Sequence, residues 1–145
     1  RKIGGMTDAN AVRYFQDKLA YETSPREVVD ALHAGDKLTL VDVRRKEAFA
    51  KGHIAGAVNL SVAALNNAAG KLDPANLIVV YDWGPASTES CRAALTLVAQ
   101  GYRVRQMIGG FEYWSRLGLG LEGPGGVTKH RASDPLVTTS DRGWD

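Results

Sequence analysis

Cysteine is almost absent from this chain of 145 residues, which contains a single one, Cys91. One thiol excludes both an internal disulfide and a zinc cluster built on cysteine. The three histidines, His33, His53 and His130, are scattered along the chain, so we expect no metal site and no other cofactor. A single cysteine suits a reducing compartment, and we therefore expect a cytoplasmic protein.

Excess charge of one sign and long apolar runs are also scarce. The formal net charge is +2, and no run of lysine and arginine is interleaved with aromatic residues, so we expect no nucleic-acid partner. No stretch reaches the length of a signal-peptide core or a membrane span, and we expect no membrane association. The hydrophobic fraction of 44% and the charged fraction of 23% are typical of a globular protein.

The chain begins with a segment that predicts one helix. Val12, Phe15 and Leu19 recur at helical spacing, which indicates an amphipathic helix over roughly residues 8–20. We assign residues 1–23 to an N-terminal helical extension.

Composition separates a central domain from a tail. Residues 24–121 alternate short apolar runs with helical patterns, whereas residues 122–145 are rich in glycine, proline, serine, threonine and charge. The second segment is therefore expected to be an extended or disordered tail, in which His130 and Arg131 are solvated charges. Residues 1–5 precede a methionine, as the remnant of an expression tag would.

Strands and helices alternate through the central domain. Ser24, Pro25 and Glu27 form the start signal of a helix, namely an N-cap, a first-turn proline and a capping-box partner. The apolar run 77–81 is typical of a central parallel strand that is covered on both faces. We therefore predict an α/β fold with a mainly parallel sheet between helices. Further strands are expected at 38–44 and 104–108, and further helices at 46–52, 62–67, 88–100 and 111–118.

The loop after residue 81 has the composition of an anion cradle. Small residues join a buried strand to the start of a helix, so that backbone N–H groups and the helix dipole converge on one point. Asp82 stands at the base of this loop. The remaining loop residues are Trp83, Gly84, Pro85, Ala86, Ser87 and Thr88.

Three segments in this order resemble the rhodanese-like domain, the single-domain type of sulfurtransferase. They are VDVRRKEAFAKGHIAGAVNL, VVYDWGP and GYRVRQMIGGFEYW, and the resemblance covers residues 24–121. It implies a three-layer α/β/α fold and an active-site loop after the central strand. In the family, a cysteine at the base of this loop takes sulfur from a donor and holds it as a persulfide. That position is Asp82 here.

The resemblance therefore predicts a site without its nucleophile. A carboxylate oxygen lacks the polarisable sulfur with which a thiolate attacks and carries sulfane sulfur. We expect Asp82 to accept the N–H bonds of the loop, as a charged persulfide would, and sulfur transfer to be lost. The expected ligand of the loop is a small sulfur-containing anion or a protein partner.

Two other functions stay open. The first is an active sulfurtransferase that uses Cys91 or a thiol of the acceptor, and the second is a structural or regulatory interaction domain. Cys91 shares one helix face with Ala94, Leu95 and Val98, which is the spacing of a core stripe, so we expect its thiol to be buried.

Several side chains are expected to support the loop. Asp42 and Arg44 end a strand, where paired charges brace a neighbouring loop more often than they catalyse, and His53 is expected to bond a turn. Arg92 is the cation nearest to the loop in sequence, and Ser87 or Thr88 is expected to cap the following helix. The loop has neither a Gly-x-Ser-x-Gly elbow nor a Gly-Lys-Ser/Thr sequence, which excludes a serine hydrolase and a Walker A site.

Overall fold

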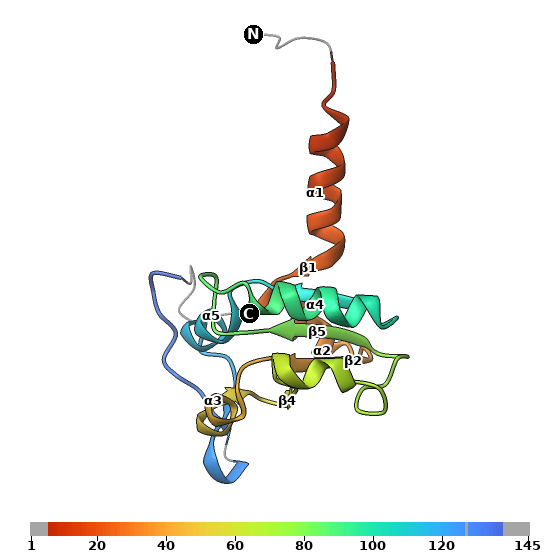
Figure 1. The fold of residues 1–145 in the computed structure, drawn as a ribbon. Helices are drawn as coiled ribbons and strands as arrows, with labels where there is room; N and C mark the ends of the chain where they lie inside the picture. Colours follow the sequence, from red (N-terminus) through yellow and green to blue (C-terminus); the bar gives the residue numbers. More distant parts are fainter. Residues whose placement is uncertain (1–5, 127, 138–145) are drawn as a thin grey trace.

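A computed structural model describes residues 6–126 and 128–137 of the chain (Figure 1). Residues 1–5, which resemble a tag remnant, lie outside the described residues. The helices are α1 Ala9–Tyr21, α2 Pro25–His33, α3 Lys46–Lys51, η1 Val62–Asn67, α4 Glu89–Ala99, α5 Gly110–Arg116 and η2 Pro124–Gly126. The strands are β1 Glu22–Thr23, β2 Leu38–Asp42, β3 His53–Ile54, β4 Val58–Asn59, β5 Leu77–Tyr81, β6 Val104–Met107, β7 Leu121–Glu122 and β8 Thr128–Lys129.

The central sheet has five strands in the order β1-β6-β5-β2-β4, and every pair is parallel. Strand β5 lies at its centre, with Val79 opposite Leu40 of β2 and Arg105 of β6. This confirms the predicted α/β class. The carboxyl ends of β2 and β5 lie side by side, because Asp42 is the register partner of Tyr81.

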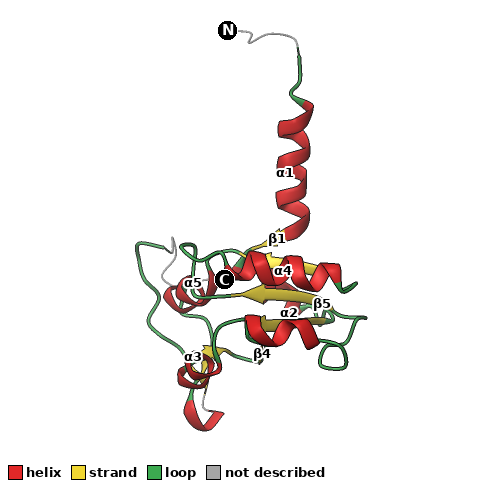
Figure 2. Cartoon of the chain, in the orientation of Figure 1, coloured by secondary structure: helices red, strands yellow, loops and turns green. Residues whose placement is uncertain are grey.

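Helices cover both faces of the sheet, which gives the expected three layers (Figure 2). Successive residues of a strand point to opposite faces. Ile78 and Val80 therefore join the core beneath η1 and α4, while Val79 and Tyr81 join the core beneath α2 and α5. The apolar run of β5 is buried on both sides, as its composition predicts.

Helix α1 forms where the sequence predicts it, with the Asp8 carboxylate accepting hydrogen bonds from the N–H groups of Asn10 and Ala11. The helix buries none of its residues and extends away from the domain (Figure 1). The start of α2 also matches its prediction, because the Ser24 hydroxyl accepts a hydrogen bond from the Glu27 N–H at 3.2 Å.

The described part of the tail lies against the domain. Strand β7 pairs with β3 and β8 in a small antiparallel sheet, so the expected boundary between residues 121 and 122 falls inside β7. Farther along, His130 Nδ1 lies 2.9 Å from the Gly118 carbonyl, and Arg131 donates to the Ser115 hydroxyl. Both residues are exposed, as the sequence predicts, and each also makes a hydrogen-bond contact with the domain.

Among the residues that the structure describes, no helix combines the length and the apolar character that crossing a membrane requires.

Candidate functional site

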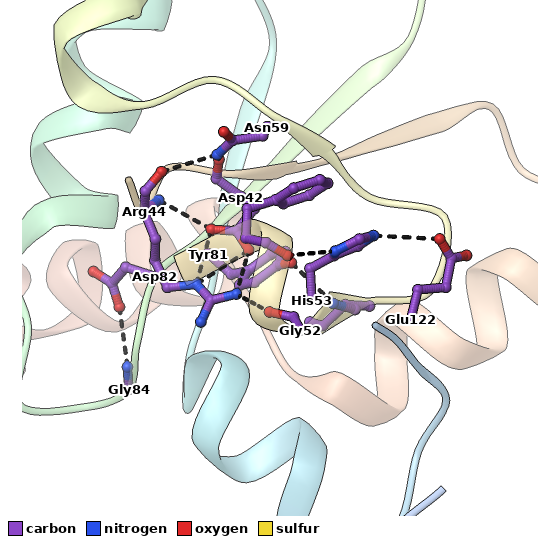
Figure 3. A network of polar contacts seen from close by, with 11 residues as sticks. Asp42, Arg44, Gly52, His53, Asn59, Tyr81, Asp82, Gly84 and Glu122 are labelled. Atoms are coloured by element: carbon purple, nitrogen blue, oxygen red, sulfur yellow. Dashed lines mark hydrogen bonds and ion pairs between the residues drawn. The ribbon is translucent and has the colours of Figure 1, made fainter. Parts of the chain in front are cut away.

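The site lies at the carboxyl end of β5, where the loop 82–88 leads into α4. Asp82 is buried, and both of its carboxylate oxygens face the loop. One oxygen accepts a hydrogen bond from the Gly84 N–H at 3.2 Å (Figure 3), and the other accepts one from the Ser90 N–H at 2.7 Å. The Asp82 side chain thus closes the loop on itself and binds a free N–H group in the first turn of α4.

Helix α5 holds the backbone of the same loop. The Phe111 N–H donates to the Asp82 carbonyl, and the Glu112 N–H donates to the Trp83 carbonyl, both at 2.9 Å. Gly110 has φ +60°, and a Cβ atom on it would lie 2.7 Å from the Asp82 carbonyl oxygen and 2.8 Å from the Gly84 nitrogen. Only a glycine permits this close approach.

Asp42 and Arg44 form a buried pair at the neighbouring strand end, as the sequence predicts. Arg44 Nη2 lies 2.7 Å from one carboxylate oxygen of Asp42, and Arg44 Nε lies 3.0 Å from the other. The same Nη2 donates to the Gly52 carbonyl at 2.6 Å, and the Asn59 amide donates to the carbonyls of Asp42 and Arg44 (Figure 3). The pair fixes the turn after β2.

Two aromatic rings link this pair to the loop. The Arg44 guanidinium carbon lies 4.6 Å from the ring centroid of Trp83 and 4.2 Å from that of Phe111. These are distances at which a cation is attracted by an aromatic face. Trp83 remains 55% exposed, so it forms the rim of the site, while its ring also contacts the Arg44 guanidinium.

Tyr81 and His53 connect the site to the rest of the domain. The Ile54 N–H donates to the Tyr81 hydroxyl, and burial together with the nearby Asp42 carboxylate raises the pKa of Tyr81. His53 Nδ1 lies 2.8 Å from the Phe49 carbonyl, which confirms that this histidine bonds a turn, and its Nε2 lies 3.3 Å from the Glu122 carboxylate. No group of three His, Cys, Asp or Glu side chains among the described residues is arranged to hold a metal ion.

The expected caps of α4 are used only in part. The Ser87 hydroxyl accepts a hydrogen bond from the Glu89 N–H at 3.3 Å, but Thr88, which occupies the N-cap position, makes no side-chain bond. The Asp82 carboxylate takes the place of a Thr88 cap, because it accepts the hydrogen bond of the Ser90 N–H in the first turn of α4. Arg92 is exposed, and it pairs with neither Asp82 nor Glu89 in the described part of the chain.

Pro85 and Ala86 complete the exposed part of the loop. The sequence reasoning missed Gln106, whose amide donates to the buried Ser90 hydroxyl at 2.8 Å and holds α4 against β6. The available signal was the polar pair Arg105 and Gln106 between the apolar residues Val104 and Met107 of β6.

The prediction that Cys91 is buried is wrong. Ser90, Ala93 and Leu97 form the face of α4 that packs on the sheet, and Cys91 lies on the outer face, where its thiol is exposed. Helix α4 carries apolar residues on both faces. The predicted core stripe, which contains Cys91, is the face that points away from the sheet. The thiol borders a groove that Tyr14 of α1 also lines and to which no residue of the loop 82–88 contributes.

These features define a three-layer α/β domain whose central strand is followed by a loop that the Asp82 carboxylate closes. The chain belongs to the family described as the Rhodanese-like domain, which matches residues 24–117. This confirms the resemblance that the sequence motifs indicated.

Similar proteins include thiosulfate sulfurtransferases named GlpE. The one from Pseudomonas putida (strain GB-1) is 38% identical over 98 residues, which are 65% of this chain and 84% of that protein. The one from Coxiella burnetii (strain RSA 493 / Nine Mile phase I) is 37% identical over 78 residues, which are 53% of this chain and 71% of that protein.

Solved structures share the fold. The BH2092 protein from Bacillus halodurans has a TM-score of 0.73 and 34% identity, covering 79% of this chain and 85% of that chain. A thiosulfate sulfurtransferase from Pseudomonas aeruginosa has a TM-score of 0.64 and 28% identity, covering 72% of this chain and 20% of that chain.

Proposed function

We propose that this rhodanese-like domain does not transfer sulfur and that its loop serves as a preformed recognition surface. The carboxylate of Asp82 occupies the position where the family resemblance expects a cysteine. The observation that supports this proposal most directly is that the Asp82 oxygens already accept the hydrogen bonds of the Gly84 and Ser90 N–H groups.

The chemistry of the carboxylate supports the loss of activity. Sulfur transfer from thiosulfate needs a nucleophile that breaks the S–S bond of the donor, releases sulfite and keeps the sulfur as a persulfide. An oxygen nucleophile does not form such a stable sulfur carrier, whereas a thiolate does.

Electrostatics act in the same direction. Two like unit charges 4 Å apart repel each other by about 4 kcal/mol at an effective dielectric constant of about 20. A small sulfur-containing anion would have to approach the Asp82 carboxylate and displace it from its two N–H donors. Such a ligand is therefore disfavoured relative to a protein partner.

A protein partner suits the surface around the loop. Trp83 is more than half exposed at the rim, and Pro85 and Ala86 are exposed beside it. Aromatic residues held rigidly by their neighbours are typical anchors of protein interfaces, and Trp83 is held by Arg44 and Phe111.

A cytoplasmic location belongs to the same proposal, on the ground that a single cysteine suits a reducing compartment.

The test is a thiosulfate and cyanide assay of thiocyanate formation on the unchanged chain and on Asp82→Cys. We expect no enzymatic turnover from the unchanged chain and a gain of turnover in Asp82→Cys, because the N–H donors of the loop remain. Asp82→Ser is the matched control, because serine is similar in size to cysteine and its hydroxyl cannot carry sulfur as a persulfide. Thiocyanate formation by the unchanged chain at a rate typical of enzymes would contradict the proposal.

The exposure of Cys91 favours a second candidate, an active sulfurtransferase that uses this thiol. Cys91→Ser separates the two functions. If the unchanged chain is active and Cys91→Ser is not, the second candidate is correct; if both chains are inactive, it is excluded.

A further inference from the structure

The described part of the tail supplies one wall of a cleft beside the loop. The cleft has a volume of about 310 Å³. It is lined by residues of the loop, of α5 and of the tail, namely Trp83, Phe111, Glu112, Ser115, Arg116 and Arg131. The tail thus adds a cation to the surface around Trp83, and this cation lies outside the residues 24–117 that the family matches.

Arg131 is held in place by contacts between the tail and the end of α5. Its Nη1 donates to the Ser115 hydroxyl at 3.1 Å, and Ser115 is only 3% exposed. The Asp134 N–H donates to the Arg116 carbonyl at 2.7 Å. The backbone of the tail also passes so close to Gly118 that a Cβ atom there would lie 3.0 Å from the Arg131 carbonyl oxygen. A side chain that is already ordered binds a ligand at a lower entropic cost.

One cation of the cleft has no counter-ion among the described residues. Glu112 Oε1 lies 3.1 Å from Arg116 Nη2, so these two charges are paired. Asp134, which does not line the cleft, lies 3.3 Å from Arg116 Nη1. Arg131 is exposed, and no carboxylate of the described chain forms an ion pair with it. Two positive groups and one negative group line the cleft, which leaves a net charge of +1.

We propose, on the basis of the recognition function proposed above, that this cleft binds an acidic side chain of the protein partner. The carboxylate would lie on Arg131 and the carbon atoms of the side chain against Trp83. A guanidinium presents parallel N–H groups that match the two oxygens of a carboxylate. Tryptophan and arginine are also enriched among the residues that dominate the binding energy of protein interfaces.

Other ligands fit the cleft less well than a single carboxylate does. Nucleic acids and anionic lipid surfaces are bound by several cations at once, whereas the net charge of the cleft lining is +1. A basic side chain would meet Arg131 and would find the Glu112 carboxylate already paired with Arg116. The charge and the exposed ring therefore favour an acidic segment of a protein.

Titration of the full chain with an end-blocked peptide of six glutamates, followed by NMR, tests this proposal. The peptide should shift the signals of the Trp83 indole N–H and the Arg131 Nε–H saturably, whereas a peptide of six glutamines should shift neither. Arg131→Gln should weaken binding about tenfold or more, because a charge-assisted hydrogen-bond pair is lost. Lys129→Gln is the matched control, since Lys129 is an exposed cation of the same tail that does not line the cleft. It should bind like the unchanged chain.

Ser115→Ala tests whether the orientation of Arg131 matters. This variant should weaken binding less than Arg131→Gln does, because the charge remains and only the hydroxyl that holds it is lost. An absence of saturable shifts, or an equal loss of binding in Lys129→Gln, overturns the proposal. Inorganic phosphate that shifts the same signals at the same concentrations would show an unselective anion site and overturn it as well.

The thiocyanate assay on the same sample separates the acidic partner from the proposed function. A chain that forms no thiocyanate and does not bind the glutamate peptide contradicts only the acidic partner. A chain that forms thiocyanate at a rate typical of enzymes contradicts the proposed function itself.

Discussion

The side chain of Asp82 has a structural role that is independent of any ligand. Its carboxylate joins the end of β5 to the loop through Gly84 and to the first turn of α4 through Ser90. Hydrogen bonds that involve a charged acceptor contribute more to stability than neutral ones. We therefore expect a replacement of Asp82 to change the stability of the domain, whatever its effect on the chemistry of the site.

We predict that Asp82→Ala lowers the free energy of unfolding by about 1–3 kcal/mol, because two buried N–H groups lose their acceptor. Asp82→Asn should cost less, since its amide oxygen still accepts one of the two bonds. Urea unfolding followed by circular dichroism measures both changes. The control is Thr88→Ala, which removes a side chain without a cap bond and should change the stability by less than about 0.5 kcal/mol. An equal stability of Asp82→Ala and the unchanged chain would refute this structural role.

For single residues, the sequence predicted hydrogen-bond and ion-pair partners better than it predicted which face of a helix is buried. The Asp42–Arg44 pair and the turn-bonding role of His53 follow from charge and position along the chain, and both are confirmed. The orientation of Cys91 depends on which of two apolar faces of α4 meets the sheet. That choice is made by tertiary packing, which a helical period alone does not encode.

At the scale of secondary-structure elements, the loop 82–88 and the start of α5 are in close contact. The start of α5 passes so close to the loop that Gly110 has no room for a side chain. Two hydrogen bonds from α5 to the carbonyls of Asp82 and Trp83 hold this contact. The loop is thus clamped between the starts of two helices, which keeps its N–H groups in place.

We predict that Gly110→Ala destabilises the domain more strongly than an alanine at another glycine with positive φ. The backbone conformation alone costs a non-glycine residue about 1–2 kcal/mol, and the new Cβ atom would overlap the backbone of Asp82 and Gly84. The matched control is Gly35→Ala, where φ is +75° and no atom lies within 4 Å of the added Cβ, so only the conformational cost applies. Thermal unfolding of both variants measures the difference; equal losses would show that the contact is not tight.

Most regular elements could be predicted from the chain, because apolar runs, capping residues and glycines mark them locally. Strands β2, β5 and β6 and helix α4 lie within a residue or two of the expected ranges, and α2 begins at its predicted start signal. Strands β7 and β8 have only two residues each and depend on pairing with β3 and with one another. Such short pairs leave no local pattern in the sequence.

At the scale of the whole molecule, the segments that flank the domain behave differently from one another. The described part of the tail is held to the domain, since the Glu122 carboxylate lies 3.3 Å from His53 and accepts a hydrogen bond from the Gly56 N–H at 2.9 Å. Helix α1 buries none of its residues, and its apolar residues Val12, Phe15 and Leu19 remain exposed. The helical period predicted that α1 is amphipathic, but a period does not say which surface covers the apolar face.

The order of the motifs predicted the family, which the comparison confirms over residues 24–117, whereas the proposed loss of activity rests on Asp82 alone. A fold supports many functions, so function has to be argued from the site. Here the site contains the loop 82–88, the buried Asp42–Arg44 pair and the close contact at Gly110, and our proposal is that Asp82 changes the chemistry.

The most direct test of this account is whether the chain can hold a sulfur atom. Intact-mass spectrometry after incubation with thiosulfate, without reductant, should find the unchanged chain unmodified. The double variant Asp82→Cys with Cys91→Ser should gain the mass of one sulfur atom, since its only thiol stands at the base of the loop. A sulfur adduct on the unchanged chain, located by peptide mapping at Cys91, would contradict the account.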